Sequence, residues 1–569
     1  MKIAHGLLAS ALCAGAVYAG ALLAACGPDE PIAVHARFGV LPQSLDACPT
    51  DPVPKGNYVD EVDLFRLKLT GVGLEQPLRK DFNASDAKSS SSLQLDGVPA
   101  GAARNLLISG LAGQGKSAVT LWRGFHLGFP VEAGKTATVP ALMTKLSTMT
   151  CARAPLGAPR LFSTATQLTD GRVLLAGGFY QIGSASCAGC REYQGTDTAE
   201  IYDPYTGTFA EAGNMTWKRG LAQSALLGDG RVLIVGGAER MTYDPVHTPF
   251  PLQPQQPVSW VEVYDPASNA FTKLTLDSTM QPALVFHTVT ALGDGRVLIA
   301  GGGTDVTAGA ATNKSIMCRV SGSAVVCTPG PSMARFRLGH TATLLDDGRV
   351  FFWGGATDSS PAGDCSNDAA VLACPEWFRP GQDVFVPVDP NNKVLGAGTT
   401  DNVFFATASH LTTDGGTFVL IAGGLRRDYS SGDLVFASSP VSDIRLYSPA
   451  ENKLGAAGGN YKLRAARLFP TSTALAWFGR AFIAGGYNSV TELLPAKDME
   501  VFDFGEGGIQ PDITAEGQPV LLRQARGGAV AVHVGGSSVV LFGGEDQQGT
   551  GRVILGTAEI YTDKMEPQL

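Results

Sequence analysis

One short pattern recurs along most of the chain: an Asp-Gly pair, an apolar run and then a Gly-Gly pair. Its clearest copy is Asp229–Gly237, which reads Asp-Gly-Arg-Val-Leu-Ile-Val-Gly-Gly. Asp-Gly is typical of hairpin turns, the apolar run predicts a buried strand, and the Gly pair ends that strand. Further copies, close or looser, end at the Gly pairs that begin at Gly177, Gly301, Gly354, Gly423, Gly485 and Gly543. Seven such units predict a repetitive all-β architecture.

Other residues keep a fixed place around these units. An arginine stands 17 or 18 residues before five of the Gly pairs, and these arginines are Arg160, Arg219, Arg337, Arg467 and Arg526. In the third and fifth units the nearby residues are Leu284 and Phe404. A second strand-like segment follows each long connection, most clearly Glu200–Pro204 and Glu262–Pro266. Each unit therefore predicts a four-stranded antiparallel meander.

An arginine, a Gly pair and a Tyr-Asp-Pro strand followed by an aromatic residue (Phe209 or Phe271) resemble the marks of the Kelch family. The resemblance implies a seven-bladed β-propeller over residues 142–569. The last unit lacks a fourth strand, and Leu142–Met149 looks like an orphan one. We expect this N-terminal strand to complete the last blade and close the ring without an exposed edge.

The first 25 residues predict a targeting segment. Lys2 precedes the apolar run Leu7–Leu23, and Leu23-Ala24-Ala25-Cys26 resembles the lipobox of bacterial lipoproteins. The resemblance implies cleavage before Cys26 and lipidation of its thiol, with residues 26–57 as anchor and tether. An ordinary signal peptide and a transmembrane helix are the alternatives. Gly27 stands where an inner-membrane retention signal carries Asp, which favours the outer membrane.

Residues 58–141 contain short runs of alternating polarity, such as Val62–Leu69, and predict an N-terminal β-sandwich. Within them Gly110–Ser117 matches the phosphate-binding P-loop letter for letter. That chemistry requires a helix to begin at the Lys-Ser pair, whereas Ala118–Phe125 predicts a strand. We therefore interpret the stretch as a hairpin turn and predict no nucleotide.

Export determines how the cysteines are interpreted. Cys13 leaves with the signal peptide and Cys26 is the anchor, and eight others remain: Cys48, Cys151, Cys187, Cys190, Cys318, Cys327, Cys365 and Cys374. An even number in an oxidising compartment favours disulfides. The spacing favours the local pairs 318–327, 365–374 and 187–190, which leaves 48 with 151. The Cys187–Cys190 pair could instead be redox-active or half of a zinc site, but no second pair at metal-ligand spacing follows.

The second connection is long in almost every unit, and these connections share one face of the predicted ring. Loops carry function on rigid scaffolds, so we expect a binding surface there, starting just after the Gly pairs. The candidate residues are Phe179, Tyr180, Tyr193, Trp260, Trp377, Arg426, Arg427, Asp428, Tyr429 and Tyr487. Aromatic faces beside arginines and carboxylates suit sugars or peptides. The alternative is that the scaffold simply tolerates long insertions.

A sandwich followed by a Kelch-like propeller also resembles galactose and glyoxal oxidases, which are copper-radical enzymes with a Tyr-His pair. His287, His340 and His410 fall in predicted first strands, but Phe286, Gly339 and Ser409 precede them. No Tyr-His pair exists, so we predict neither catalysis nor a metal or other cofactor. The net charge of -9 and the lack of a basic stripe argue against nucleic-acid binding.

The leading hypothesis is a lipid-anchored scaffold of the cell envelope that binds a protein or a glycan. The alternative is a copper-radical oxidase relative or glycan-active enzyme with a site at the propeller channel mouth. A purely structural envelope component is the third hypothesis.

Overall fold

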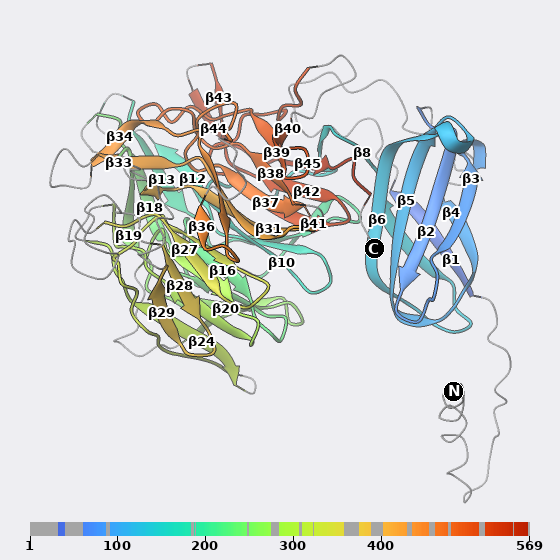
Figure 1. Ribbon diagram of the computed structural model, residues 1–569, viewed down its shortest axis with the longest axis horizontal. Coiled ribbons are helices and arrows are strands. Elements are labelled where there is room, and N and C mark those ends of the chain that lie inside the picture. Colours follow the sequence, from blue (N-terminus) through green and yellow to red (C-terminus); the bar gives the residue numbers. More distant parts are fainter. Residues whose placement is uncertain are drawn as a thin grey trace, which may run out of the picture.

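The computed structural model describes residues 32–39, 61–86, 92–183, 187, 189–246, 250–274, 284–306, 310–321, 324–357, 375–388, 402–428, 435–454, 461–475, 479–510, 518–549 and 551–566. Within these ranges the protein consists of strands with almost no helix (Figure 1). The predicted all-β class is therefore confirmed. Among the described residues, no helix has the length and apolar character needed to cross a membrane.

Two N-terminal sheets share one core. The first has the order β3 (Leu78–Asn83), β2 (Leu64–Gly71), β5 (Gly101–Ala112), β6 (Val119–Val131) and β8 (Thr144–Lys145). The second has the order β4 (Ser92–Val98), β1 (Ile32–Gly39) and β7 (Ala137–Leu142). Alternate residues of β2, including Phe65 and Leu67, pack with Leu95 of β4 and Val139 of β7. The period-two pattern of the sequence therefore places one face of each sheet in the core.

The P-loop-like stretch lies between two antiparallel neighbours. Strand β5 ends at Ala112, a single 3-10 turn (η1) spans Gly115–Ser117, and β6 begins at Val119. The side chain of Lys116 is exposed. The residues after Ser117 form a strand, as the sequence predicts, and not the helix that would bind phosphate.

From Thr164 onward the chain forms a series of four-stranded antiparallel sheets in sequence order, which we call the ring sheets. The first is β10 (Thr164–Gln167), β11 (Val173–Ala176), β14 (Ala199–Asp203) and β15 (Thr208–Glu211), and the second is β16 (Gln223–Leu226), β17 (Val232–Val235), β20 (Val261–Asp265) and β21 (Ala270–Leu274). The third is β22 (Thr288–Ala291), β23 (Arg296–Ala300), β24 (Ser315–Ser321) and β25 (Ala324–Pro329), and the fourth is β26 (Thr341–Leu344), β27 (Val350–Trp353), β28 (Glu376–Arg379) and β29 (Val384–Pro387). The fifth is β31 (Thr407–Thr413), β32 (Gly416–Ala422), β35 (Ile444–Ser448) and β36 (Lys453–Leu454), and the sixth is β37 (Thr471–Leu475), β38 (Arg480–Ala484), β39 (Met499–Asp503) and β40 (Gly508–Gln510). The last is β41 (Val530–Gly535), β42 (Ser538–Phe542), β45 (Ala558–Thr562) and β9 (Met149–Cys151).

The repeated sequence pattern explains the ring sheets locally. The apolar run of the second unit is β17, in which all four side chains are fully buried. Gly230 in the turn before it has a φ of 86°, a conformation that glycine adopts without strain. Gly236 has a φ of 61°, and a Cβ atom there would lie 2.4 Å from the carbonyl oxygen of Leu284. The Gly pair is thus required because the backbone of the next ring sheet passes directly against it.

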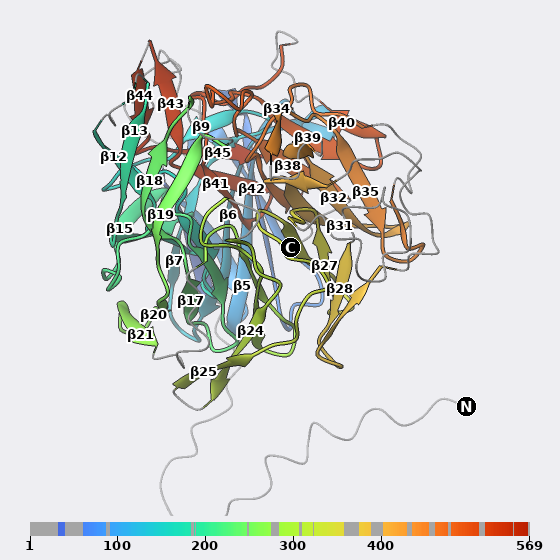
Figure 2. The same ribbon diagram turned by 90° about the vertical axis from the view of Figure 1, so that its left-hand side faces the viewer.

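The ring sheets form a closed, propeller-like cycle. Each first strand contacts the first strand of the next sheet, and β41 contacts β10. Figure 2 views the ring from the side opposite the N-terminal sheets. Strand β9 pairs with β45 and supplies the fourth strand of the last sheet from the N-terminal side. The predicted closing segment Leu142–Met149 is corrected to Met149–Cys151. Its earlier residues belong to β7 and β8, because Thr144 and Lys145 pair with β6 of the N-terminal sheet.

Five ring sheets contain a buried ion pair that we call the Arg–Glu pair. The N···O distances are 2.7 Å for Arg160–Glu200, 2.5 Å for Arg219–Glu262, 2.9 Å for Arg337–Glu376, 2.7 Å for Arg467–Glu500 and 2.8 Å for Arg526–Glu559. Each glutamate also accepts a backbone N–H, as Glu262 does from Thr216 at 2.7 Å. In the third and fifth sheets, which lack the arginine, Ile316 and Arg445 pair with the second strand where the glutamate stands elsewhere. Arginine and glutamate are therefore present together or absent together.

The N-terminal sheets pack against one face of the ring. The first and third connections of each ring sheet lie on this face, which we call the tight-turn face. The Tyr205 ring stacks on His126 at 3.9 Å between centroids, and Gly535 and Gly536 lie beside Leu127 and Phe125. The Arg123 guanidinium, held between the two parts, donates to the Asp563 carbonyl at 2.9 Å. The opposite face, from which the long second connections leave, points away from the N-terminal sheets (Figure 1).

Candidate functional site

The long second connections form a second layer of strands over the opposite face, which we call the long-connection face. Strands β12 (Phe179–Gly183), β13 (Arg191–Gly195), β18 (Ala238–Tyr243) and β19 (Leu252–Pro257) join the connections of the first two ring sheets into one four-stranded sheet. Strands β30 (Val403–Phe404), β33 (Leu425–Asp428) and β34 (Val435–Pro440) form a three-stranded sheet, and β43 (Glu545–Gln548) and β44 (Gly551–Ile554) form a hairpin. In Figure 1, β18, β19, β33 and β34 lie far from β1 to β6. These connections therefore form regular, paired strands over much of their described length.

Phenylalanine rings fill the centre of the ring beneath this layer. Phe162, Phe286, Phe405 and Phe469 all have φ between 50° and 58°, and Leu221 has the same conformation. The Phe405 ring lies 4.6 Å from Phe469 and 5.0 Å from Phe286 between centroids. Backbone N–H groups at these positions donate to the equivalent carbonyl of the preceding ring sheet, as Phe469 does to Phe405 at 3.0 Å. The left-handed conformation costs about 1–2 kcal/mol per non-glycine residue, and the apolar packing offsets it.

A buried carboxyl group ties three long connections together. Glu545, the first residue of β43, is 2% exposed and accepts hydrogen bonds from Tyr487 at 2.9 Å and Tyr193 at 3.4 Å. The Arg191 guanidinium lies 3.9 Å from the same carboxylate and 4.0 Å from the ring centroid of Tyr243. Burial raises the pKa of Glu545 and the pKa values of both hydroxyl groups. The network fixes these connections relative to one another, because an unpaired polar group here would be costly.

The residue directly after each Gly pair lies in this buried zone. Phe179, Leu425, Tyr487 and Glu545 follow their pairs and are all buried, and each forms a β-bridge or strand pair with the segment before a first strand. The expectation that the binding surface begins just after the glycines is therefore wrong. The chain turns inward at that point and emerges only further along the connection.

The exposed side chains of this layer are a different set. On β12, Tyr180 is 40% exposed and Ile182 is 45% exposed. Trp217 and Trp260 are partly exposed, with ring centroids 5.4 Å apart, and the Trp217 indole donates to the Glu239 carboxylate at 2.8 Å. Paired aromatic rings beside a carboxylate can stack on a sugar or hold a peptide. The candidate site is therefore the outer surface of the β12-β13-β18-β19 sheet and its surroundings.

The predicted site residues divide by burial. Phe179, Tyr193, Trp377 and Tyr487 are buried, so their direct contact with a partner, expected from the sequence, is corrected. Trp377 lies within β28 and packs on Phe351 and Tyr447. Tyr180, Trp260 and Arg426 are accessible, and Arg426 pairs with Asp443. Arg427 and Asp428 lie on β33, but their side chains and all of Tyr429 are outside the described residues.

Two predicted disulfides are present. Cys187 is bonded to Cys190, and Cys318 to Cys327 across the directly paired strands β24 and β25. Cys151 is also disulfide-bonded. The predictions for Cys26, Cys48, Cys365 and Cys374 concern residues outside the described ranges.

The histidines considered for an oxidase site are buried or peripheral. His287 and His340 precede adjacent first strands, and His340 shares a hydrogen bond of 3.1 Å with Thr288. Burial lowers the pKa of His287 to about 4 and lowers the pKa of His340 well below its ordinary value. His410 lies near the tight-turn face, 3.6 Å from Asp346. The structure therefore brings only His287 and His340 together among these three.

Comparisons with known proteins identify no family. No protein-family model matches the chain, and no curated protein matches it. A solved structure titled "Structure of YjhT" is similar over 63% of this chain and 98% of that one, with 14% identity and a TM-score of 0.40. A likeness at this level carries no inference about the function of this chain.

Sequence reasoning missed Glu545, Arg191 and the glutamates of the Arg–Glu pairs. A signal for the glutamates was present, because Glu stands two residues before the aromatic residue of the third strand only in units that have the arginine. Two of the positions equivalent to these phenylalanines are glycines, Gly339 and Gly528, and this also indicates a positive φ at these positions. Glu545 had no comparable signal, because its partners come from other units.

Proposed function

We propose that the ring sheets are the blades of a seven-bladed Kelch-like β-propeller that follows an N-terminal β-sandwich. The closed cycle of first-strand contacts and the completion of the last sheet by β9 support this assignment. The repeated arginine, Gly pair and Tyr-Asp-Pro strand support the Kelch likeness.

We further propose that the protein is a lipid-anchored scaffold of the cell envelope that binds a protein or glycan without catalysis. The observation that carries this proposal is the second layer of strands on the long-connection face. Connections that are already paired, disulfide-linked and held by the Glu545 network lose little conformational entropy when a partner binds. If the scaffold merely tolerated long insertions, these connections would need no strand pairing, disulfide or buried network.

The position of the second layer agrees with anchoring through Cys26. The N-terminal sheets occupy the tight-turn face, so a chain tethered at its N-terminus would hold the opposite face away from the lipid surface. Exposed aromatic and apolar side chains at Tyr180, Ile182 and Trp260 fit a peptide or a sugar ring.

The binding hypothesis is tested with the purified mature protein on arrays of glycans and of purified envelope proteins. The variants are Tyr180→Ala and Ile182→Asp. The matched control is Val326→Asp, because Val326 is 42% exposed and lies on an outer strand of the third ring sheet. We expect the two β12 variants to weaken a specific interaction at least about tenfold, as loss of a central contact does, and the control to leave it unchanged.

Equal losses in all three variants, or no array partner at all, would count against the proposed face. Oxidase activity after copper loading would favour the enzyme alternative. Retention of Cys26→Ser in the membrane fraction would contradict the lipid anchor.

A further inference from the structure

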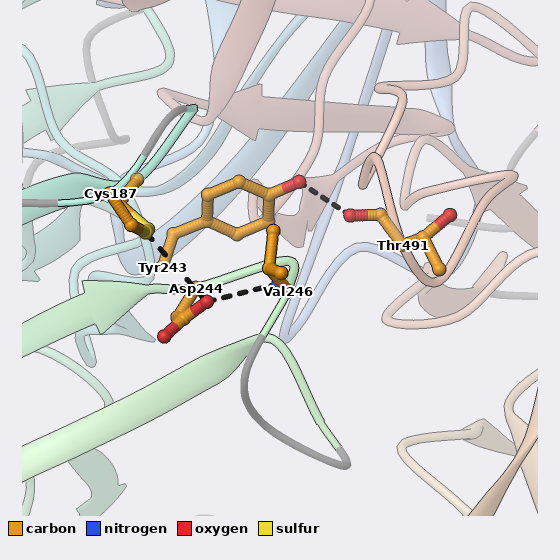
Figure 3. Close-up of a disulfide and its surroundings, with 6 residues drawn as sticks. Cys187, Tyr243, Asp244, Val246 and Thr491 are labelled. Carbon is orange, nitrogen blue, oxygen red and sulfur yellow. Dashed lines mark hydrogen bonds between the residues drawn. A yellow bond between two sulfur atoms is a disulfide. The ribbon is translucent and has the colours of Figure 1, made fainter.

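Two hairpins of the second layer bring sulfur and oxygen donors together. Cys187 and Cys190 lie in the connection from β12 to β13, and Asp244 follows β18 in the neighbouring hairpin (Figure 3). The Sγ atom of Cys187 is 3.8 Å from Oδ1 of Asp244. One donor atom from each of the three residues lies within 4.8 Å of the others. Cys187 is partly exposed, whereas Cys190 is buried.

We propose that Cys187, Cys190 and Asp244 bind a Zn²⁺ ion when the two cysteines are reduced. The sequence alone argues against zinc, because no second ligand pair follows the cysteines at the usual spacing. The fold supplies a third ligand instead, 57 residues after Cys187 in the chain and from a different hairpin. This inference does not depend on the proposed binding function.

The separation between Cys187 and Asp244 suits a tetrahedral zinc site. Zinc binds thiolate sulfur at about 2.3 Å and carboxylate oxygen at about 2.0–2.2 Å, so sulfur and oxygen ligands of one ion lie about 3.5 Å apart. The observed 3.8 Å between Cys187 and Asp244 is close to this separation. A hydrogen bond of 3.0 Å from the backbone N–H of Val246 orients the carboxylate. Three protein ligands leave the fourth position to water or to a ligand atom from outside.

The negative charge of the reduced form favours the binding of a cation. Two thiolates and a carboxylate within 4.8 Å repel one another strongly in a partly buried setting. A divalent cation removes that repulsion and lowers the pKa of the coordinating thiols. In the oxidised form both sulfurs are in the S–S bond and neither is available as a thiolate.

The two states interconvert by balanced steps. A dithiol reductant transfers two electrons and two protons to the disulfide, which gives two thiols while the reductant becomes a disulfide. Zn²⁺ then displaces the two thiol protons and forms two Zn–S bonds and one Zn–O bond. The disulfide links β12 to β13 within one hairpin, whereas zinc would also link that hairpin to β18. Zinc would thus add a second link between two hairpins of the candidate surface that the pairing of β13 with β18 already joins.

The proposal is tested with full-length mature protein reduced by a phosphine and titrated with Co²⁺ and then Zn²⁺. Thiolate-to-cobalt charge-transfer absorption reports the ligands, and displacement by zinc gives the relative affinity. We expect one equivalent of metal to be lost in Cys187→Ser/Cys190→Ser and kept in the control Cys318→Ser/Cys327→Ser. Asp244→Asn keeps the acceptor for the Val246 N–H and should weaken binding about tenfold or more, since even indirect ligand partners contribute that much.

Unchanged affinity in Asp244→Asn, or equal binding by the oxidised protein, would overturn the proposal. So would loss of the metal in the Cys318→Ser/Cys327→Ser control only. If reduction unfolds the protein, zinc added with the reductant must restore the thermal transition of the wild type and not that of Cys187→Ser/Cys190→Ser. Failure to do so would also reject the site.

Discussion

The two ends of a single ring sheet carry the same kind of ion pair in different surroundings. In the second ring sheet, Arg219 and Glu262 are fully buried at the end nearest the long-connection face, 2.5 Å apart. At the tight-turn end, Arg231 and Asp229 are 2.6 Å apart and partly exposed. A buried pair cannot lose one member without leaving a desolvated charge, whereas water screens the exposed one. The ion pair whose disruption costs the most stability therefore lies at the end of the sheet nearest the candidate surface.

The largest effect is expected at the buried end. Glu262→Ala removes the carboxylate that neutralises the buried Arg219 guanidinium and accepts the Thr216 N–H, which should lower the free energy of unfolding by about 3–5 kcal/mol. Urea denaturation of the purified protein measures this loss. Replacing both members with methionine should recover most of it, because no charge then remains buried. A double variant as unstable as Glu262→Ala would contradict the claim that the unpaired buried charge causes the loss.

A smaller effect depends on pH. Burial lowers the pKa of His287 to about 4 in the folded protein, against about 6.5 in the unfolded chain. The unfolded state therefore binds more protons below pH 6.5, and the folded protein loses stability as the pH falls from 6.5 to 4. The loss for this group approaches about 3 kcal/mol, and most of it occurs below pH 6.5.

Urea midpoints of the wild type and of His287→Gln, measured at pH 7.5 and 4.5, test this expectation. The variant should lose less stability on acidification than the wild type. Because His340 lies nearby and has a pKa lowered in the same direction, the variant should retain part of the pH dependence. Identical pH dependence in the two proteins would contradict the assignment to His287.

The smallest effect is expected at the exposed end of the same sheet. Asp229→Ala removes the ion pair to Arg231 and the 3.2 Å hydrogen bond that the backbone N–H of Arg231 donates to Asp229. The free energy of unfolding should fall by about 0.2–1 kcal/mol. The same urea experiment, run beside Glu262→Ala at low and high salt, compares the two ends directly. A loss above about 2 kcal/mol would mean that exposure does not separate the two pairs.

The sequence predicts features that repeat or are close together in the chain. The Asp-Gly turn, the apolar strand and the Gly pair specify each ring sheet locally, so its second strand could be placed from residues such as Val232–Val235. The Cys187–Cys190 and Cys318–Cys327 disulfides were predictable because each closes a short segment.

What depends on contacts between units could not be predicted in the same way. The sequence predicts Tyr193 and Tyr487 as surface aromatics, but both donate hydrogen bonds to Glu545, a residue 58 positions after Tyr487. Asp244 reaches Cys187 only because β13 and β18 pair across two units. Composition indicates that aromatic residues are present in the long connections, whereas only packing decides which of them face solvent.

The pairing of β9 with β45 bears on how the molecule reaches its native state. Thr150 and Ile560 meet although 410 positions separate them, and the last ring sheet is complete only when both are present. Such distant pairing makes closure a late and slow event during folding. A chain interrupted before β45 would keep β9 as an unpaired edge, open to association with other strands. Because β9 pairs with β45, the last ring sheet can be completed only after the chain has been made as far as β45.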